Sequence, residues 1–198
     1  MSSLPNQKYT VDEYFAMERT SDVRHEYHNG EIFAMAGASF NHARIVQNIS
    51  LSLGNKVTGK GSCEVVTNDV RVRINDLRYV YPDVIVVCGG PDLDHSDTLL
   101  NPNVVFEILS DSTDDYDQNK KFEYYQRIAT LTDYILVAQD RTHIKYHQRE
   151  GNTWSQYRTT IYTNPTDTLS IASIGCTLAV ADVYARVIFE TLPTDDMD

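Results

Sequence analysis

The chain has 198 residues, and its 17 basic and 28 acidic side chains give a formal net charge of −11 at neutral pH. The length suits a single domain with a full hydrophobic core, and no apolar run is long enough to cross a membrane. The charge argues against a protein that coats nucleic acid with a broad basic surface, but not against an enzyme that gathers cations in a cleft. We predict one domain over residues 1–190 and a disordered acidic tail over residues 191–198.

Two features bear on the cellular location. The N-terminus "MSSLPNQKYT" is polar and lacks the apolar segment of a secretion signal, which predicts a cytoplasmic protein. Cys63, Cys88 and Cys176 are far apart in the sequence and form no CxxC pair. We therefore expect three reduced thiols, with neither a disulfide framework nor a zinc site.

The N-terminal third predicts a helix, a hairpin and a longer helix, in that order. "YTVDEYFAMER" begins with Thr10 and Glu13 at the spacing of a capping box. "RHEYHNGEIFAMAG" turns at Asn29-Gly30, the pair preferred in two-residue hairpin turns. Residues 39–57 predict an amphipathic helix, because apolar residues recur at helical spacing. These apolar residues are Ile45, Val46, Ile49, Leu53 and Val57.

The rest of the chain predicts strands around one further long helix. Four strand-like runs, "CEVVTN", "VRVRI", "VYPDVIVVC" and "NVVFEILS", precede the helical segment "STDDYDQNKKFEYYQRIA", which has acids in its first turn. "DYILVA", "HIKYHQRE" and a strand around "TWSQYRTT" follow, and "VADVYARVIF" predicts a closing helix. This order indicates an α/β or α+β domain, with a central mixed sheet flanked by helices.

Two carboxylates stand inside apolar strand-like runs. Asp83 follows Pro82 in "YVYPDVIVVCGG", and Glu107 lies within "NPNVVFEILSDST". A buried carboxylate costs several kcal/mol unless a cation or hydrogen bonds compensate it. Either residue alone could bond to the backbone or lie at an exposed strand end. Two of them in successive strands that pair favour a shared divalent cation, Mg²⁺ or Mn²⁺.

A lysine in the following helix can approach these acids. At about 100° per residue, Lys121 falls beside Ile128 on the flank of the apolar stripe, whereas Lys120 points away from it. Lys121 can therefore extend toward the sheet. An ion pair with Asp117, four residues earlier, is the alternative, and it is compatible with a catalytic role.

The strip "TNDVRVRINDLRY" alternates between polar and apolar residues. Asp69, Arg71 and Arg73 share one face of the predicted strand. A solvated face with salt bridges is the favoured interpretation. The other is that Asp69 supports an active site while the arginines hold phosphates. The acidic run from Asp92 to Asp97 predicts a polar loop rather than a metal site.

Three segments together resemble a known family. "YPDVIVV", "NPNVVFEILSDST" and "YDQNKKFEYYQRIATLTDYILVAQD" are similar to the Uma-type restriction-endonuclease-like proteins of the PD-(D/E)xK nuclease superfamily, and the similarity extends over nearly the whole chain. The resemblance implies a restriction-endonuclease-like core and a metal-dependent phosphodiesterase. Asp83 and Glu107 then match the two metal-binding acids. Leu109 stands where the simple motif has its lysine, so the resemblance assigns that role to Lys121.

The resemblance also brings in two supporting residues. His42, near the start of the second helix, matches a histidine of the family pattern. A packed or capping histidine is the more frequent role at such a position, and contact with a substrate phosphate or a metal-bound water is the functional alternative. Glu31 fits the family's Gly-Glu pair, which makes it a third acid of the cleft or a strand-end acid.

Three functions remain open. The leading hypothesis is a Mg²⁺- or Mn²⁺-dependent endonuclease that hydrolyses DNA, and the resemblance implies a homodimer because two strands need two sites. The alternative is a catalytically silent nuclease-fold module with a binding or regulatory role, which the acidic composition favours. Hydrolysis of a smaller phosphoester is the third.

Overall fold

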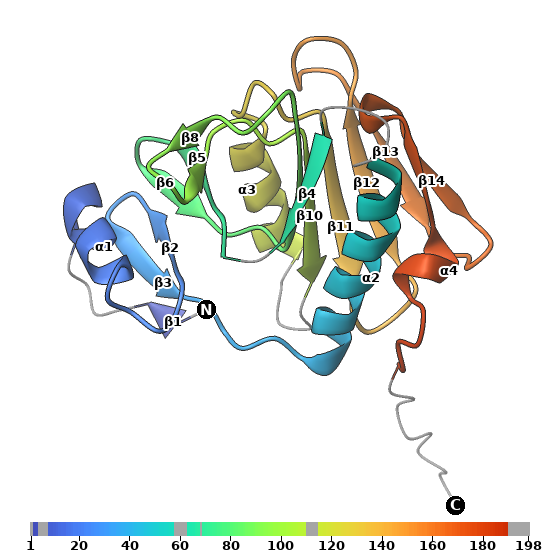
Figure 1. The fold of residues 1–198 in the computed structure, drawn as a ribbon, viewed down its shortest axis with the longest axis horizontal. Helices are drawn as coiled ribbons and strands as arrows, with labels where there is room; N and C mark the ends of the chain where they lie inside the picture. The colour runs from blue at the N-terminus through green and yellow to red at the C-terminus, as the bar shows by residue number, and fades with distance from the viewer. Residues whose placement is uncertain (1, 4–7, 58–62, 68, 110–114, 190–198) are drawn as a thin grey trace, which may run out of the picture.

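A six-stranded mixed sheet forms the centre of the computed structural model (Figure 1), which describes residues 2–3, 8–57, 63–67, 69–109 and 115–189, with the backbone alone over 2–3 and 115–118. The predicted acidic tail lies outside the described residues. The acids predicted in the first turn of the helix after Glu107 lie outside the described side chains. Within the sheet β10 and β11 are parallel, and the other neighbours are antiparallel. The strands, in spatial order, are β13 (Tyr157–Tyr162), β12 (Ile144–Arg149), β11 (Asp133–Ala138), β10 (Val104–Leu109), β7 (Val84–Cys88) and β4 (Cys63–Thr67).

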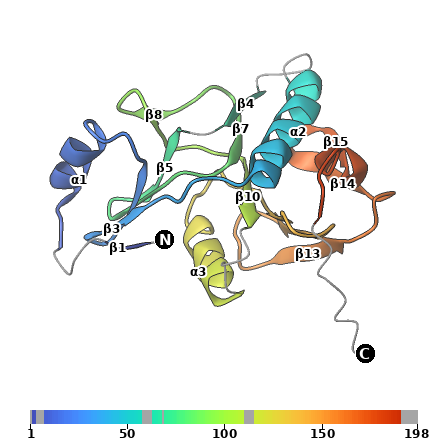
Figure 2. The ribbon, with the colours of Figure 1, turned by 90° about the horizontal axis from the view of Figure 1, so that it is seen from below.

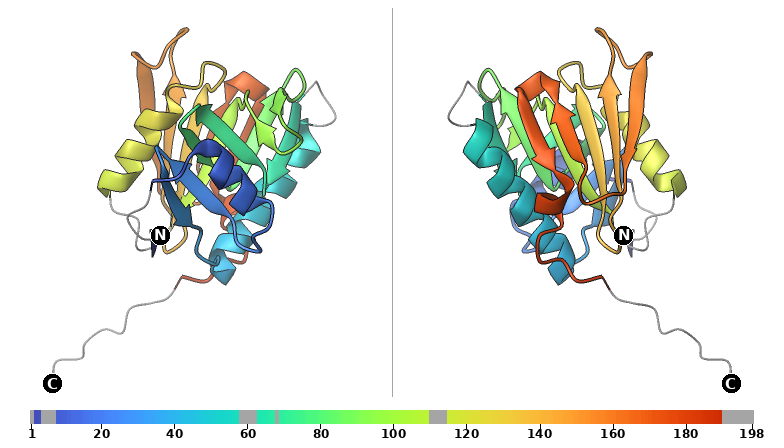
Figure 3. Two further views of the ribbon diagram at one scale, coloured as in Figure 1. Left: turned by 90° about the vertical axis from the view of Figure 1, so that its left-hand side faces the viewer. Right: turned by 90° about the vertical axis from the view of Figure 1, so that its right-hand side faces the viewer.

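Helices cover both faces of this sheet, as predicted. Helix α2 (Phe40–Val57) packs its apolar stripe on the face that holds Val104 and Phe106, whereas α3 (Asp115–Tyr125) packs on the face that holds Val105. Successive strand residues point to opposite faces, so β10 contributes to both cores. Figure 3 shows the two helices on opposite sides. Among the described residues, no helix is long and apolar enough to cross a lipid bilayer.

The C-terminal segment adds a small hairpin to the α2 side. Strands β14 (Thr168–Ile171) and β15 (Cys176–Ala179) pair around the 3₁₀ helix Ala172–Ile174, and Leu169 and Leu178 join the core beneath α2. The predicted closing helix is only α4 (Val180–Val183), because the chain leaves helical geometry near Tyr184.

A second sheet of short strands lies beside α3, on the side of the molecule that carries α1 (Figure 1). The sequence predicted only one central sheet. Helix α1 (Val11–Glu18) packs on it through Tyr14 and Phe15, which contact Tyr79. The run predicted as a polar loop contributes β8 to this sheet. In spatial order its strands are β1 (Ser2–Ser3), β3 (Glu31–Ala34), β2 (His25–His28), β6 (Arg78–Val80), β5 (Arg71–Asn75), β9 (Thr98–Leu99) and β8 (Leu93–Asp94).

The two local sequence signals of this region are confirmed. The backbone N–H of Glu13 donates to Thr10 Oγ1 at 3.2 Å, and the backbone N–H of Thr10 donates to Glu13 Oε2 at 2.7 Å, which completes the capping box. The β2–β3 turn places Asn29 and Gly30 at φ values of 51° and 92°. Positive φ at both positions is what a type I′ turn requires, and it explains the Asn-Gly pair.

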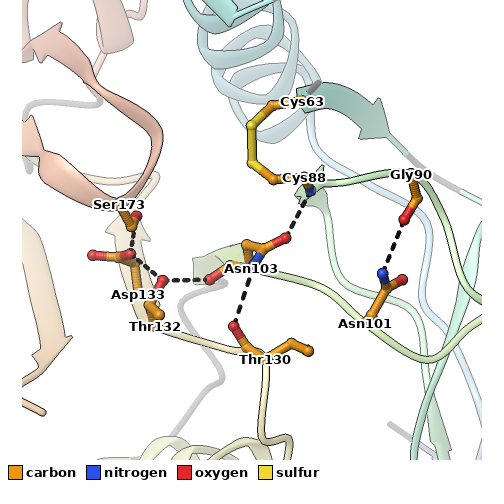
Figure 4. The surroundings of a disulfide bond; sticks show 9 residues. All are labelled: Cys63, Cys88, Gly90, Asn101, Asn103, Thr130, Thr132, Asp133 and Ser173. Atoms are coloured by element: carbon orange, nitrogen blue, oxygen red, sulfur yellow. Dashed lines mark hydrogen bonds between the residues drawn. A yellow bond between two sulfur atoms is a disulfide. The ribbon is translucent and has the colours of Figure 1, made fainter. Parts of the chain in front are cut away.

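The prediction of three free thiols is wrong for two of them. Cys63 and Cys88 form a disulfide, shown in Figure 4, whereas Cys176 is free and buried. The two cysteines are 25 residues apart in the chain, but the antiparallel register of β4 and β7 places them directly opposite each other. Nearby, the side chain of Asn103 accepts a hydrogen bond from the backbone N–H of Cys88 at 2.7 Å. The spacing in the sequence did not reveal this pairing because it arises from strand register.

Candidate active site

The two strand carboxylates lie together at one end of β7 and β10. These strands are antiparallel with Val84 opposite Phe106, so Asp83 and Glu107 are opposite each other one step further along. Both share the α3 face of the sheet. Asp83 lies immediately before β7 rather than within it, and its Oδ2 accepts a hydrogen bond from the backbone N–H of Ile108 at 2.7 Å. The predicted pairing of the two strands is therefore confirmed.

Lys121 extends from α3 into this group of acids. Its Nζ is 3.0 Å from Glu107 Oε1 and 3.4 Å from Glu26 Oε1, whereas Lys120 is exposed. The helical phase thus distinguished the two lysines correctly. The hydroxyl of Tyr125, one turn further along α3, also donates to Glu107 Oε1 at 2.7 Å. Sequence reasoning did not indicate this contact.

Glu26 is an acid of the cluster that sequence reasoning missed. It lies on β2, is 2% exposed, and its Oε2 is 3.0 Å from His28 Nε2. Figure 2 shows the β2–β3 side of the molecule next to α3, which brings Glu26 within reach of Lys121. Alternation along β2 could have indicated it, because Tyr27 packs into the apolar core and its two polar neighbours must face the other way.

His42 reaches the cluster from the other helix. Its Nε2 lies 3.1 Å from Asp83 Oδ1. Its Nδ1 is buried and has no hydrogen-bond partner among the described residues. Burial opposes the charged imidazolium, but the hydrogen bond and charge of Asp83, aided by Glu107, outweigh it and raise the pKa of His42. His42 is therefore packed against a candidate catalytic acid, and its contact with a substrate phosphate or a metal-bound water stays a prediction.

The two acids that contact Lys121 have pKa values shifted in opposite directions. Burial, reinforced by the charges of Asp83 and Glu26, raises the pKa of Glu107 to about 7 despite Lys121. For Glu26, burial is outweighed by Lys121 and His28, which lower its pKa to about 2. Burial opposes the charge of Lys121, yet Glu107 and Glu26 together raise its pKa well above the ordinary value. The cluster thus contains a fixed ammonium and an excess of carboxylate.

The donor set fits a hard divalent cation with several water ligands. Asp83 and Glu107 offer oxygen atoms, and each carboxylate has lone pairs beyond those used by its present donors. Mg²⁺ is commonly held by one or two carboxylates while keeping several waters. Within the described part of the chain no three His, Cys, Asp or Glu side chains converge as a metal site. An ion at this position would therefore depend on the two acids, backbone oxygen and water.

Two predicted supporting acids lie outside the cluster. Glu31 shares a hairpin face with Glu26, but it is exposed at the turn end of β3. Asp69 is exposed, and its Oδ1 is 3.1 Å from Arg24 Nε. The expectation that Asp69 supports the site is therefore wrong. Glu31 is the strand-end acid of the two alternatives, because the hairpin turn leaves it in solvent.

The arginines of β5 form salt bridges, as the favoured interpretation held. Arg71 Nη2 is 2.6 Å from Asp97 Oδ2, and Arg73 Nη1 is 2.7 Å from Asp94 Oδ2. The idea that Arg71 holds phosphates is wrong, as is the idea that it is solvated. It is 2% exposed, and its guanidinium lies over the rings of α1 at 4.5 Å from the centroid of Phe15.

The fold and the cluster together describe a mixed α/β protein with a carboxylate–lysine site where two sheets meet. A family model described as "Uma2: Putative restriction endonuclease" matches residues 11–181. The chain belongs to this family. The resemblance seen in the sequence is thereby confirmed.

The chain is also similar to individual proteins. The uncharacterised protein slr1290 of Synechocystis sp. is 34% identical over 189 residues, which cover 94% of this chain and 97% of the relative. A second uncharacterised Synechocystis protein, sll1609, is 34% identical over 146 residues, covering 72% and 82%. The crystal structure of a protein from Anabaena variabilis, described as a putative nuclease belonging to DUF820, has a TM-score of 0.74 at 15% identity. It matches 91% of this chain and 99% of its own, which supports the fold.

Proposed function

We propose that this protein is a Mg²⁺- or Mn²⁺-dependent endonuclease that hydrolyses DNA phosphodiester bonds. The observation that carries the proposal is the joint placement of Asp83, Glu107 and Lys121, with the ammonium 3.0 Å from Glu107 and both acids on the α3 face of paired strands. Membership of the family described as "Putative restriction endonuclease" supports it. A homodimer, with one site for each strand, is part of the proposal.

Each residue has a role that its contacts support. Asp83 and Glu107 would hold the divalent ion, which supplies an activated water and neutralises charge on the phosphoryl group. Lys121, held as a cation by two carboxylates, would position the attacking water or bind a phosphate oxygen. His42 orients Asp83 through its Nε2 contact. Tyr125 fixes one oxygen of Glu107 through its hydroxyl.

The test begins with metal binding. Calorimetric titration of Mg²⁺ and Mn²⁺ should show binding to the wild-type protein and none to Asp83→Ala or Glu107→Ala. A panel of single-stranded, double-stranded and branched DNA then tests cleavage with each metal. Metal binding that is the same in all three proteins would exclude Asp83 and Glu107 as the ligands and overturn the proposal.

One observation favours the alternative of a silent binding or regulatory module. Both oxygens of Asp83 already have donors, from Ile108 and His42, and Glu107 Oε1 has two more from Lys121 and Tyr125. A cluster so well bonded can persist without an ion. Such a module would bind DNA or another partner without metal-dependent cleavage, and the same DNA panel therefore decides between the two functions.

A further inference from the structure

A cavity of about 480 Å³ lies between the end of α3 and the turn that joins β5 to β6. Arg78, Tyr124 and Arg127 line it, together with Asn75 and Asp76 of the turn. A second cavity of about 270 Å³ shares Asn75, Asp76 and Arg127 with the first. Cavities of several hundred Å³ are typical of small-ligand sites, so the space suits a group of nucleotide size.

Two arginines give this cavity a positive charge. The guanidinium carbon of Arg78 lies 3.2 Å from the centroid of the Tyr124 ring, and that of Arg127 lies 5.7 Å from the same centroid. Neither side chain forms an ion pair with a carboxylate in the part of the chain that the structure describes. Burial lowers the pKa of Arg78 most strongly. The interaction with Tyr124 raises it and the like charge of Arg127 lowers it, and the net result is a lowered pKa. Two guanidinium groups beside one ring, neither of them in an ion pair among the described residues, indicate an anionic ligand.

A chain of contacts joins the cavity to the candidate active site. Arg78 Nε donates to His28 Nδ1 at 2.9 Å, so the proton of the neutral ring is on Nε2. That Nε2 lies 3.0 Å from Glu26 Oε2, and Glu26 Oε1 lies 3.4 Å from Lys121 Nζ. Arg78 and Lys121 are therefore held in relation to each other through only two intervening side chains.

Helix α3 and the turn after it set the spacing between the two places. Lys121, Tyr124 and Arg127 follow one another at intervals of three residues, and Arg127 lies in the turn directly after α3. At about 1.5 Å per helical residue, Tyr124 is roughly 4.5 Å beyond Lys121 along α3, and Arg127 comes just after the end of the helix. The cavity and the cluster are therefore close enough for one nucleic-acid strand to reach both.

We propose that Arg78 and Arg127 form a subsite for a backbone phosphate of a nucleic-acid strand, close to the phosphate held at the carboxylate–lysine cluster. The inference extends the proposed nuclease function and rests on it for the second phosphate. Arginine forks match phosphate oxygens, and backbone contacts of this kind fix the register of a strand without reading its sequence. Asp76 lines the same cavity and opposes the anion.

Arg127 is the residue to test, because it is exposed and its loss should leave the fold intact. The measurement is the fluorescence anisotropy of labelled single-stranded and duplex DNA, titrated in an Asp83→Asn background that cannot cleave it. We expect Arg127→Gln to weaken binding about 5- to 10-fold and to reduce the salt dependence by about one phosphate contact. Asp76→Asn should strengthen binding. Arg141→Gln, which removes an exposed arginine paired with Asp140, is the matched control and should change affinity less than about 2-fold.

Cleavage of the same DNA by the wild-type protein with Mg²⁺ separates the two possible failures. Cleavage together with unchanged binding in Arg127→Gln would overturn the subsite and leave the nuclease. Binding that depends on Arg127 without any cleavage would support the subsite and overturn the nuclease. An absence of DNA binding in every variant would overturn the subsite whatever the cleavage result.

Discussion

Two regions of this molecule bury charged side chains, and they balance those charges differently. Around Arg71 a single cation packs against aromatic rings and is bonded to Asp97 and Thr98. Where α3 meets the two sheets, one ammonium serves two carboxylates directly, with a third acid beside them. These acids are Glu26, Glu107 and Asp83. The first region pairs one cation with one carboxylate, which is typical of a structural element, whereas the second has more acidic groups than cations, and a metal ion would offset this excess.

The largest expected effect is on activity, in the acidic region. Glu107→Gln keeps the shape of the side chain and removes its charge, so metal-dependent cleavage should fall by about 10³-fold or more, roughly 4 kcal/mol of transition-state stabilisation. The same change relieves repulsion with Asp83 and Glu26, so the free energy of unfolding should stay constant or rise. Cleavage rates and urea denaturation measure the two effects.

Glu31→Gln is the matched control for this substitution. Glu31 is exposed at the hairpin turn, so neither activity nor stability should change measurably. A Glu107→Gln protein that lost several kcal/mol of stability would contradict the comparison, because Glu107 would then be a structural partner like Arg71.

The second effect is on stability, in the region around Arg71. Arg71→Met leaves the apolar volume but removes a buried cation and its contact with Asp97, and we expect a loss of about 3 kcal/mol in the free energy of unfolding. Metal binding should persist, as calorimetry can show. Arg73→Met, on the same face of the same strand, removes a half-exposed pair with Asp94 and should cost less than about 1 kcal/mol. Equal losses of unfolding free energy in the two variants would show that Arg71 stabilises the fold no more than an ordinary surface arginine does.

A histidine that has no carboxylate partner among the described residues provides a third, smaller test of charge balance. His147 is buried on β12, where its ring stacks on Phe122 at 4.2 Å between centroids. Burial, with a contribution from the charge of Lys145, lowers the pKa of His147 to about 4. Since the ordinary value is near 6.5, the unfolded chain binds the proton first, and stability present above pH ~6.5 is lost as the pH falls toward ~4.

The size of this loss should be roughly 3 kcal/mol. His147→Phe keeps the stacking area and cannot be protonated, so its stability should fall less over the same pH range in urea denaturation. His95→Gln, at an exposed position, should behave as the wild type does. A His147→Phe protein with the wild-type pH dependence would show that other groups control acid unfolding.

How much of the site could be predicted follows from the range of the interactions involved. Asp83, Glu107 and Lys121 were found because alternation in strands and periodicity in a helix are local properties of the sequence. The direction of Lys121 follows from the helical period, and the pairing of the two strands was expected because they are successive strands of one sheet. The central sheet and the helices on its faces could be predicted for the same reason.

The remainder depends on contacts between distant segments. Arg71 looked like a surface residue because nothing in β5 shows that the aromatic rings of α1 cover it. The cysteine pair depends on the register of β4 against β7. Glu26 enters the cluster only because a hairpin packs beside a helix whose lysine is 95 residues further along the chain. The resemblance directed attention to Glu31 instead, which shares the hairpin but not its buried end.

Glu26 therefore gives the sharpest remaining test of the acidic region. The Glu26 carboxylate contacts both Lys121 and His28 but is not one of the two acids, Asp83 and Glu107, that would bind the metal. Its role would therefore be to position the lysine. Glu26→Gln should reduce cleavage about 10-fold, or roughly 1.4 kcal/mol, while the affinity for Mg²⁺ changes little, because Asp83 and Glu107 stay in place. Glu123→Gln, an exposed change on α3, is the control. If Glu26→Gln abolished metal binding as Glu107→Ala is expected to do, Glu26 would be a ligand, and the excess charge of this region would be shared by three acids rather than concentrated on two.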